Sequence, residues 1–370
     1  MTTRFLTKLL AAVAPLWAED SGRLLRLDHY VPVRSTAPVI AGQTTQVYVR
    51  EVTLAGAALR GASAADRVVL FVHGAGTPAE VAFDVPHADY SWMAFLAHEG
   101  YDVFSMDMTG YGRSTRPLAM NDPCNLAREQ QLQFGPACPE ASYGRNMTTI
   151  ASDWNDIGAV VDYLRARRHV EKVNLIGWSL GGPRAGGYTA RNQDKVNKLI
   201  LLSPAYNRNG GAEPPVELPA KGAAMNTQSH AEFLANWTRQ IGCPDQYDPA
   251  ASDAVWKAML ESDPVGATWG SGVRRAPLVT TWGWNAGVVA KVMTPTLLFA
   301  PAHDKQVAPR SVQNLHADLG STRKVLVDLA CTSHNALWEK NHLLLFRASL
   351  EWLSKGTVEG KGEGSARLGY

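Results

Sequence analysis

The stretch Gly177–Gly182 (GWSLGG) decides the fold, because it directly follows the short apolar run Lys172–Ile176 (KVNLI) and opens a helical pattern. A sharp turn from a strand into a helix holds the residue at its tip in strained backbone geometry and brings the two segments close together. Only small residues fit two positions before and two positions after the tip, where Gly177 and Gly181 stand. The turn is therefore expected to raise the Ser179 hydroxyl above the edge of a sheet.

Ser179 at this tip has the surroundings that a nucleophile needs. The amide of Leu180 comes at the N-terminus of the following helix, where it faces negative charge that develops on a substrate oxygen. A serine hydroxyl is inert at neutral pH, so it requires a general base, and the base requires a group that orients it. The sequence thus predicts nucleophilic catalysis by Ser179, assisted by a histidine and an acid elsewhere in the chain.

Apolar runs rich in β-branched residues alternate with longer helical patterns over most of the chain. This alternation is typical of βαβ units and predicts an α/β fold with a mostly parallel central sheet flanked by helices. The expected strands are Gln46–Leu54, Arg67–Val72, Tyr101–Met106, Lys172–Ile176, Lys198–Leu202, Pro295–Ala300 and Lys324–Leu329. The expected helices are Ser91–His98, Ser152–Arg168 with Ser152 as N-cap, Leu180–Arg191 and Lys340–Leu353.

A gap of about ninety residues, with helical and loop character but no clear strand pattern, separates the strands that end near Leu202 and begin near Pro295. Long insertions of this kind tend to form lids over a site. We therefore expect a mainly helical cap inserted between the sixth and seventh core strands. The expected organisation is a leader over 1–28, the first part of the core over 29–204, the cap over 205–292, the second part of the core over 293–355 and a flexible tail over 356–370.

Tryptophan is unusually frequent, with 11 residues against 9 phenylalanines, and the expected cap holds five of them. Two interpretations remain open. The rings form the core of the cap and its seam with the main domain, or they line an apolar or aromatic pocket for the substrate. The candidate substrate-binding residues are Trp237, Trp256, Trp269, Trp282 and Trp284.

Four separate segments together resemble the α/β-hydrolase superfamily, and they cover most of residues 46–353. They are His73–Gly76 (HGAG), Asp107–Ser114 (DMTGYGRS), the turn around Ser179, and Asp304 with His334. The resemblance implies an α/β-hydrolase fold of the serine esterase type with a helical lid. In the second segment, Asp107 and its glycines are more often structural than catalytic in this family.

The resemblance also implies roles for single residues. His334, just past the final expected strand, lies where the family places its general base, and Asp304, after the penultimate strand, lies where it places the acid. The order Ser179, Asp304, His334 along the chain is that of α/β hydrolases. The amide of Ala75 would be the second donor of the oxyanion hole beside the amide of Leu180.

A serine rather than an aspartate at the tip of the turn decides the type of reaction. Dehalogenases and epoxide hydrolases of this superfamily use a carboxylate nucleophile, so these activities are disfavoured. The expected function is hydrolysis of a carboxylic ester of an apolar or aromatic small molecule by a Ser-His-Asp triad, with no cofactor and no metal. Two alternatives stay open: a C–C bond hydrolase of the β-diketone type or an acyltransferase of the same fold, and a non-catalytic binding protein.

Composition argues against several other classes of protein. The 36 Lys and Arg nearly balance the 34 Asp and Glu, and no basic block occurs, which argues against nucleic acid as a partner. No apolar run reaches the ~18 residues that span a bilayer. The expected partner is a small-molecule substrate, and the pattern does not indicate an oligomeric state.

The N-terminus and the cysteines leave alternatives open. Residues 1–18 place two positive charges before an apolar run, which is typical of a secretory signal, and an amphipathic leader on a cytoplasmic enzyme is the other interpretation. The four cysteines form no C-x-x-C motif, so a zinc site is not indicated. Cys124 and Cys138 share one polar loop, where they form a disulfide in an exported protein or stay as thiols.

Overall fold

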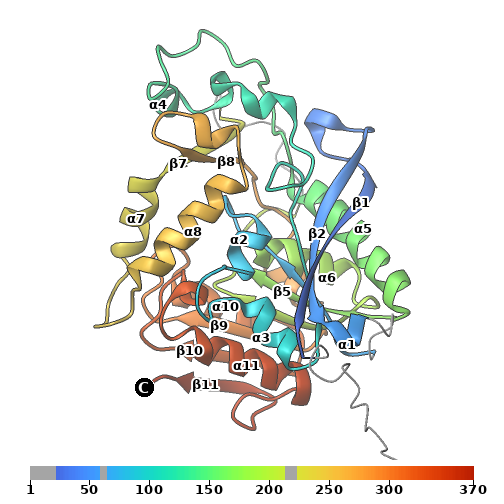
Figure 1. Ribbon diagram of the computed structural model, residues 1–370. Helices are drawn as coiled ribbons and strands as arrows, with labels where there is room; N and C mark the ends of the chain where they lie inside the picture. Colours follow the sequence, from blue (N-terminus) through green and yellow to red (C-terminus); the bar gives the residue numbers. More distant parts are fainter. Residues whose placement is uncertain (1–21, 59–64, 213–222) are drawn as a thin grey trace, which may run out of the picture.

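A nine-stranded sheet forms the centre of the computed structural model, which describes residues 22–58, 65–212 and 223–370 (Figure 1). The strand order is β1-β2-β4-β3-β5-β6-β9-β10-β11. Strand β2 is antiparallel to both of its neighbours, β1 and β4, and all other neighbouring pairs are parallel. The strands are β1 (Leu24–Arg34), β2 (Thr44–Leu54), β3 (Val68–Val72), β4 (Asp102–Met106), β5 (Val173–Trp178), β6 (Val196–Leu202), β9 (Thr296–Pro301), β10 (Lys324–Leu329) and β11 (Gly364–Leu368).

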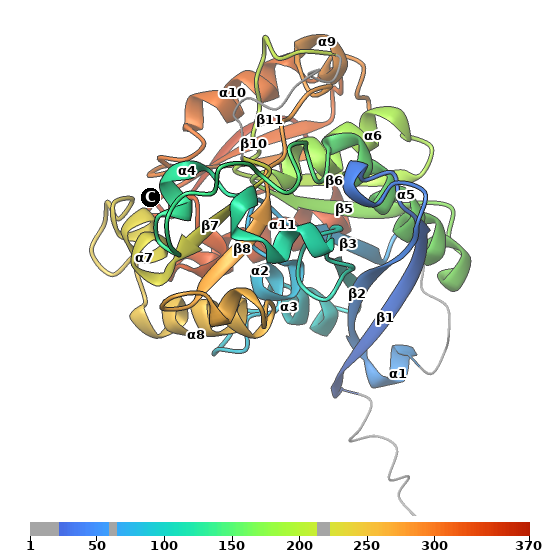
Figure 2. The ribbon, with the colours of Figure 1, turned by 90° about the horizontal axis from the view of Figure 1, so that it is seen from above.

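Helices cover both faces of this sheet. The helices are α1 (Ala55–Ala58), α2 (Ala79–Phe83), α3 (Trp92–His98), α4 (Arg128–Gln131), α5 (Ile150–Arg168), α6 (Gly187–Arg191), α7 (His230–Thr238), α8 (Pro249–Glu261), α9 (Ala286–Val289), α10 (Pro309–Asp318) and α11 (His342–Lys355). Successive side chains of a strand point to opposite faces, so Val69 and Phe71 pack on the side of α2, α3 and α11. Leu70 and Val72 pack on the side of α5, α6 and α10. Figure 2 shows α6 and α10 on one side of the sheet and α2 and α3 on the other. No helix within the described ranges is long and apolar enough to cross a membrane.

The strands and helices expected for the core are confirmed to within a few residues, but two helix starts differ. Helix α5 begins earlier than expected: Thr149 is its N-cap, and Ser152 stands at the third helical position, where it completes a capping box. After the turn at Ser179 the chain forms a π-helix, Gly182–Gly186, before α6 begins. Glycine is needed at both ends of this segment, because a Cβ at Gly182 would lie 2.6 Å from Pro204 and a Cβ at Gly186 would lie 2.5 Å from Trp284.

The first strand, β1, was not indicated by the sequence pattern. It pairs antiparallel with β2 along its whole length, and its side chains are mostly exposed or half-buried, which explains the weak apolar signal. Of the expected leader 1–28, residues 1–21 lie outside the described residues. The part from Leu24 onward belongs to this strand.

Part of the expected flexible tail, residues 356–370, belongs to the sheet. It carries β11, which pairs in parallel with β10 and buries Ala366. The Glu351 carboxylate of α11 holds the preceding turn, since it accepts hydrogen bonds from the amides of Glu359 and Gly360, at 3.1 Å each. Glycine and charge in this segment therefore mark a turn and an exposed edge strand.

The segment between β6 and β9, called the insertion below (residues 205–292), combines helices with a pair of strands. In chain order, β6 and β9 are the sixth and seventh strands of the large sheet. The insertion contains α7, α8 and α9, and its strands β7 (Met225–Ser229) and β8 (Val273–Pro277) pair antiparallel. The sequence indicated no strand here because MNTQS and VRRAP lack the apolar runs that mark core strands.

All four cysteines form disulfides. The pair Cys124–Cys138 closes the loop between β4 and α5, which is one of the two alternatives left open by the sequence. The pair Cys243–Cys331 joins the insertion to the loop after β10, across 88 positions of the chain. Spacing along the sequence gives no sign of this second pairing.

Candidate active site

Ser179 lies at the tip of the turn that follows β5 and has a left-handed φ of 57°. A Cβ at Gly181 would collide with the carbonyl oxygen of Val72, and a Cβ at Gly177 would collide with the backbone of Gly181. Both positions therefore require glycine, as the sequence predicts. The amide of Ser179 donates to the carbonyl of Leu202 at 2.9 Å and so fixes the turn on the neighbouring strand.

His334 and Asp304 form a hydrogen-bonded pair. The ring nitrogen Nδ1 of His334 lies 2.9 Å from Oδ2 of Asp304. The other carboxylate oxygen accepts the amides of Gln306 and Val307, both at 2.8 Å. Because an ionised carboxylate only accepts hydrogen bonds, Nδ1 carries the proton and Nε2 is left as the basic nitrogen. His334 lines the same cavity as Ser179.

The loop His73–Gly76 runs beside the nucleophile candidate. The backbone of Gly74 comes so close that a Cβ there would lie 3.0 Å from Cβ of Ser179. Ala75 lines the cavity together with Ser179. Within the described residues, neither the amide of Ala75 nor that of Leu180 donates a hydrogen bond. These two backbone amides therefore have no hydrogen-bond partner in the described structure, and an oxyanion hole is built from free donors of this kind.

A buried network holds this loop in place. Nε2 of His73 accepts the amide of Met108 at 3.0 Å, so the neutral ring carries its proton on Nδ1 and donates to the carbonyl of Gly74 at 2.7 Å. Burial lowers the pKa of His73 well below its usual value, which keeps the ring neutral. Arg184 donates to the carbonyl oxygens of His73 and Gly74 at 3.0 and 2.9 Å, and it pairs with Asp153 at 2.6 Å.

Asp107 braces the neighbouring loop and does not line the cavity. Its carboxylate accepts the amides of Ala79 at 2.8 Å and Arg113 at 3.0 Å, and burial raises its pKa to about 6. Gly112, with a φ of 48°, leaves the space for this carboxylate, because a Cβ there would overlap it. The placement is that of a structural residue.

The cavity that contains Ser179 has a volume of about 130 Å³ and a largely polar wall. Both the core and the insertion contribute to it. Beyond the residues expected from the sequence, its polar lining residues are Thr77, Gln228, Asn236, Arg274, Gln306 and Asn335. The sequence did not indicate them, because single polar residues on loops, on a helix and on two short strands carry no spacing signal. In the described part of the chain, no group of three or more His, Cys, Asp or Glu side chains is arranged to hold a metal ion.

The loop that carries the candidate base is tied to the insertion by a buried carboxylate and a disulfide. Glu339 accepts the amide of Ser333 at 2.7 Å and the indole N–H of Trp237, in α7, at 2.9 Å. Burial raises the pKa of Glu339. The disulfide Cys243–Cys331 joins the same two segments. The position of the base therefore depends on the insertion as well as on β10.

Three of the five candidate tryptophans are packing residues of the insertion. Trp237 and Trp256 pack against Phe233 in the apolar cluster that the insertion shares with the core. Trp269 packs edge-on against Phe134 of the loop between β4 and α5. Large apolar rings stabilise a fold most where two segments meet and exclude water. The packing of these three rings agrees with the first of the two interpretations given above.

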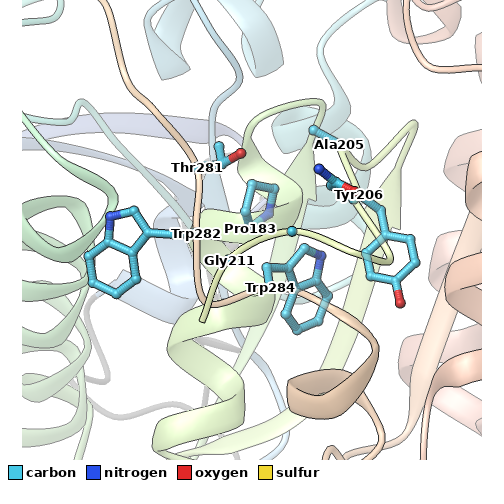
Figure 3. Close-up of a pocket in the computed structure, with 9 residues that line it drawn as sticks. Pro183, Ala205, Tyr206, Gly211, Thr281, Trp282 and Trp284 are labelled. Atoms are coloured by element: carbon cyan, nitrogen blue, oxygen red, sulfur yellow. The ribbon is translucent and has the colours of Figure 1, made fainter. Parts of the chain in front are cut away.

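Trp282 and Trp284 line a different pocket, of about 220 Å³ (Figure 3). Pro183 of the π-helix and Tyr206 lie on its other sides, and Ser179 is not part of it. None of the five tryptophans is among the described residues that line the cavity of Ser179. The sequence left open whether these rings pack the insertion or line a substrate pocket, and other described residues line the cavity of Ser179.

Comparison with known proteins agrees with this fold. A family model for the alpha/beta hydrolase fold matches residues 67–341, and the chain therefore belongs to that family. Similar solved structures include a thermophilic esterase from Thermogutta terrifontis (15% identity, 88% of this chain and 98% of that chain, TM-score 0.53). Others are a monoacylglycerol lipase from Paleococcus ferrophilus (18%, 84% and 99%, 0.52) and a serine hydrolase from Cycloclasticus zankles (14%, 88% and 98%, 0.51). At these identities the likeness concerns the fold, and the search of curated proteins found no match.

Proposed function

We propose that this protein is a serine-dependent hydrolase that cleaves carboxylic esters through an acyl-enzyme on Ser179. The observation that carries the proposal is the placement of Ser179, in strained backbone geometry, in one cavity with His334. That histidine is oriented by Asp304 through the 2.9 Å hydrogen bond. Esterases and lipases among the structural relatives agree with hydrolysis as the class of reaction.

In the proposed reaction, Oγ of Ser179 attacks the ester carbonyl carbon while Nε2 of His334 takes the hydroxyl proton. The amides of Ala75 and Leu180 stabilise the negative charge on the carbonyl oxygen. His334 then gives its proton to the departing alcohol, which leaves the acyl group on Ser179. A water molecule, deprotonated by the same nitrogen, attacks the acyl-enzyme and releases the carboxylic acid.

The insertion acts as a cap in this proposal, because it supplies one side of the cavity wall. Gln228 of β7, Phe233 and Asn236 of α7, and Arg274 of β8 line the cavity with Ser179. A volume of about 130 Å³ is small beside the ~300–1,000 Å³ of pockets for drug-sized ligands. The polar wall and small volume favour a short, polar ester over the apolar or aromatic one expected from the tryptophans.

Hydrolysis of p-nitrophenyl acetate by the wild-type protein and by two serine variants tests this function. Ser179→Ala should lower kcat/KM by roughly 10⁴-fold or more, since the nucleophile is lost, and should keep the wild-type circular dichroism spectrum. Ser354→Ala, at an exposed serine of α11, is the matched control and should keep full activity. Turnover by the Ser179 variant at the wild-type rate would disprove the proposal.

A further inference from the structure

One cation faces the cavity of Ser179 without an acidic partner in the described part of the chain. Arg274 is half-buried in β8 and lines the cavity. Its Nη1 donates to the hydroxyl of Thr77 at 2.8 Å, and no described Asp or Glu forms an ion pair with it. Burial lowers the pKa of Arg274 to about 10, which leaves the group charged at neutral pH.

Arg275, the next residue of β8, has a structural role and differs from Arg274 in its partners. Side chains alternate along a strand, so Arg275 points to the opposite face of β8 and is fully buried. It donates to both carboxylate oxygens of Asp263, at 2.6 and 2.9 Å, and to the side chain of Asn121 at 2.9 Å. Buried charges normally have such partners, and among the described residues Arg274 has only a hydroxyl.

A second unpaired polar group stands beside Arg274. Gln228 is its direct partner across the ribbon of β7 and β8, and both residues line the cavity. Within the described residues the side-chain oxygen of Gln228 is buried and has no hydrogen-bond partner. Rotation of its amide group presents two N–H donors at the same place. The ribbon thus offers a cation and an adaptable amide to the same occupant.

The guanidinium of Arg274 lies close to the reacting centre. It rests against Gly76, where a Cβ would come within 2.6 Å of Nη1. Gly76 directly follows Ala75, the candidate oxyanion donor. Among the described residues that line the cavity there is no Asp or Glu, so none of them balances the charge of Arg274.

On these grounds, and resting on the proposed function, we infer that Arg274 binds a carboxylate carried by the ester substrate. Guanidinium and carboxylate match each other with two parallel hydrogen bonds, which are stronger than bonds between neutral groups. Gln228 completes the recognition from the neighbouring strand. Because a cavity of about 130 Å³ holds both the carboxylate and the ester, only a short chain separates them, as in half-esters of small dicarboxylic acids.

Paired substrates of equal shape and different charge test this inference. Monoethyl succinate carries a carboxylate in its acyl part, and ethyl levulinate replaces this carboxylate with a methyl ketone. Acetoxyacetate and acetoxyacetone form the same pair with the carboxylate in the alcohol part. The wild-type enzyme should hydrolyse at least one anionic ester with a kcat/KM roughly tenfold to a hundredfold above that of its neutral partner. The pair that shows the preference identifies the part of the ester that carries the carboxylate.

Substitution of Arg274 tests whether this residue causes the preference for the anionic ester. Arg274→Gln should lower kcat/KM for the anionic ester by roughly tenfold or more beyond any loss on the neutral ester, so that the preference disappears, and Arg274→Lys should restore part of the preference. Arg167→Gln removes one exposed positive charge from α5 and should leave the preference unchanged. Circular dichroism and thermal unfolding verify that each variant folds.

The other outcomes separate the two claims. An equal loss on anionic and neutral esters in Arg274→Gln would mean that the arginine only supports the loop of Gly76, and it would overturn the inference. Equal hydrolysis of both esters by the wild-type enzyme would overturn it as well, while the proposed function stands. Hydrolysis of neither these esters nor p-nitrophenyl acetate would contradict the proposed function itself.

Discussion

The edge of the central sheet and the insertion contribute to the same cavity in different ways. At the sheet edge, backbone geometry dictates the residues: glycines at 177 and 181 are required because no side chain fits there. The insertion supplies polar side chains, with Arg274 and Gln228 on two short strands. Local steric constraint explains which residues stand at the sheet edge. The residues of the insertion that reach the cavity can be identified only from the tertiary structure. Under the proposed function, the core provides the chemistry and the insertion selects the substrate.

The largest expected effect is at the sheet edge. His334→Ala removes the only histidine that lines the cavity among the described residues, and kcat/KM should fall by roughly 10⁴-fold or more on charged and neutral esters alike. Steady-state kinetics with p-nitrophenyl acetate measure the loss. A loss in kcat/KM confined to anionic esters would mean that His334 selects the substrate and does not take part in the chemistry.

A smaller effect is expected where the two regions are joined. The double variant Cys243→Ser with Cys331→Ser removes one of the two links between the loop of the candidate base and the insertion, so kcat/KM should fall about three- to tenfold. The melting temperature should also fall by several degrees, since disulfides that close long loops stabilise by about 2–4 kcal/mol.

The other disulfide is the matched control for this change. Removal of Cys124–Cys138, which closes the loop between β4 and α5, should lower the melting temperature but leave kcat/KM within about twofold. Equal losses of activity in the two double variants would show that the link between insertion and base has no special role.

A pH effect on stability should arise in the core. Burial raises the pKa of Asp156 to about 7 from an ordinary value of 3.8, so between these values the folded protein holds a proton that the unfolded chain has released. The free energy of unfolding should therefore fall as the pH rises from 4 to 7. Asp156→Asn still accepts the amide of Thr109 and never ionises, so its melting temperature should exceed that of the wild-type protein at pH 8 by a few degrees and approach it at pH 4. An unchanged pH dependence in the variant would contradict this account.

The smallest effect is expected at the tryptophans of the second pocket. Trp282 packs edge-on against Trp154 with ring centroids 5.2 Å apart, and it does not line the cavity of Ser179. Trp282→Ala should therefore change kcat/KM on short esters by less than about threefold. A loss in kcat/KM of a hundredfold or more in a folded variant would show that Trp282 contributes to the substrate site.

Much of the fold could be predicted because parallel strands buried on both faces leave strong apolar runs in the sequence. Strand β5 is such a strand, and the glycines at 177 and 181 mark the tight turn that follows it. Strand β1 and the tail strand β11 lie at the two edges of the sheet, where side chains are exposed and the apolar signal is weak. Their pairing follows from the neighbouring strands and not from their own pattern.

The candidate site divides in the same way. The positions of Ser179, Asp304 and His334 follow from the turn and from the ends of two core strands. Arg274 stands beside a second arginine in the short run VRRAP, and only the fold shows that one faces the cavity while the other pairs with Asp263. Tryptophan content pointed to the insertion, but none of the five candidate rings is among the described residues that line the cavity of Ser179.

Mapping the residue that reacts with a fluorophosphonate probe tests the central claim most directly. Such probes modify a serine only when its hydroxyl is activated by a base and an oxyanion hole. Mass spectrometry should find a single adduct on the peptide that contains Ser179, with no adduct in Ser179→Ala and slow labelling in His334→Ala. A protein that stays unlabelled, or an adduct on a different serine, would contradict the account.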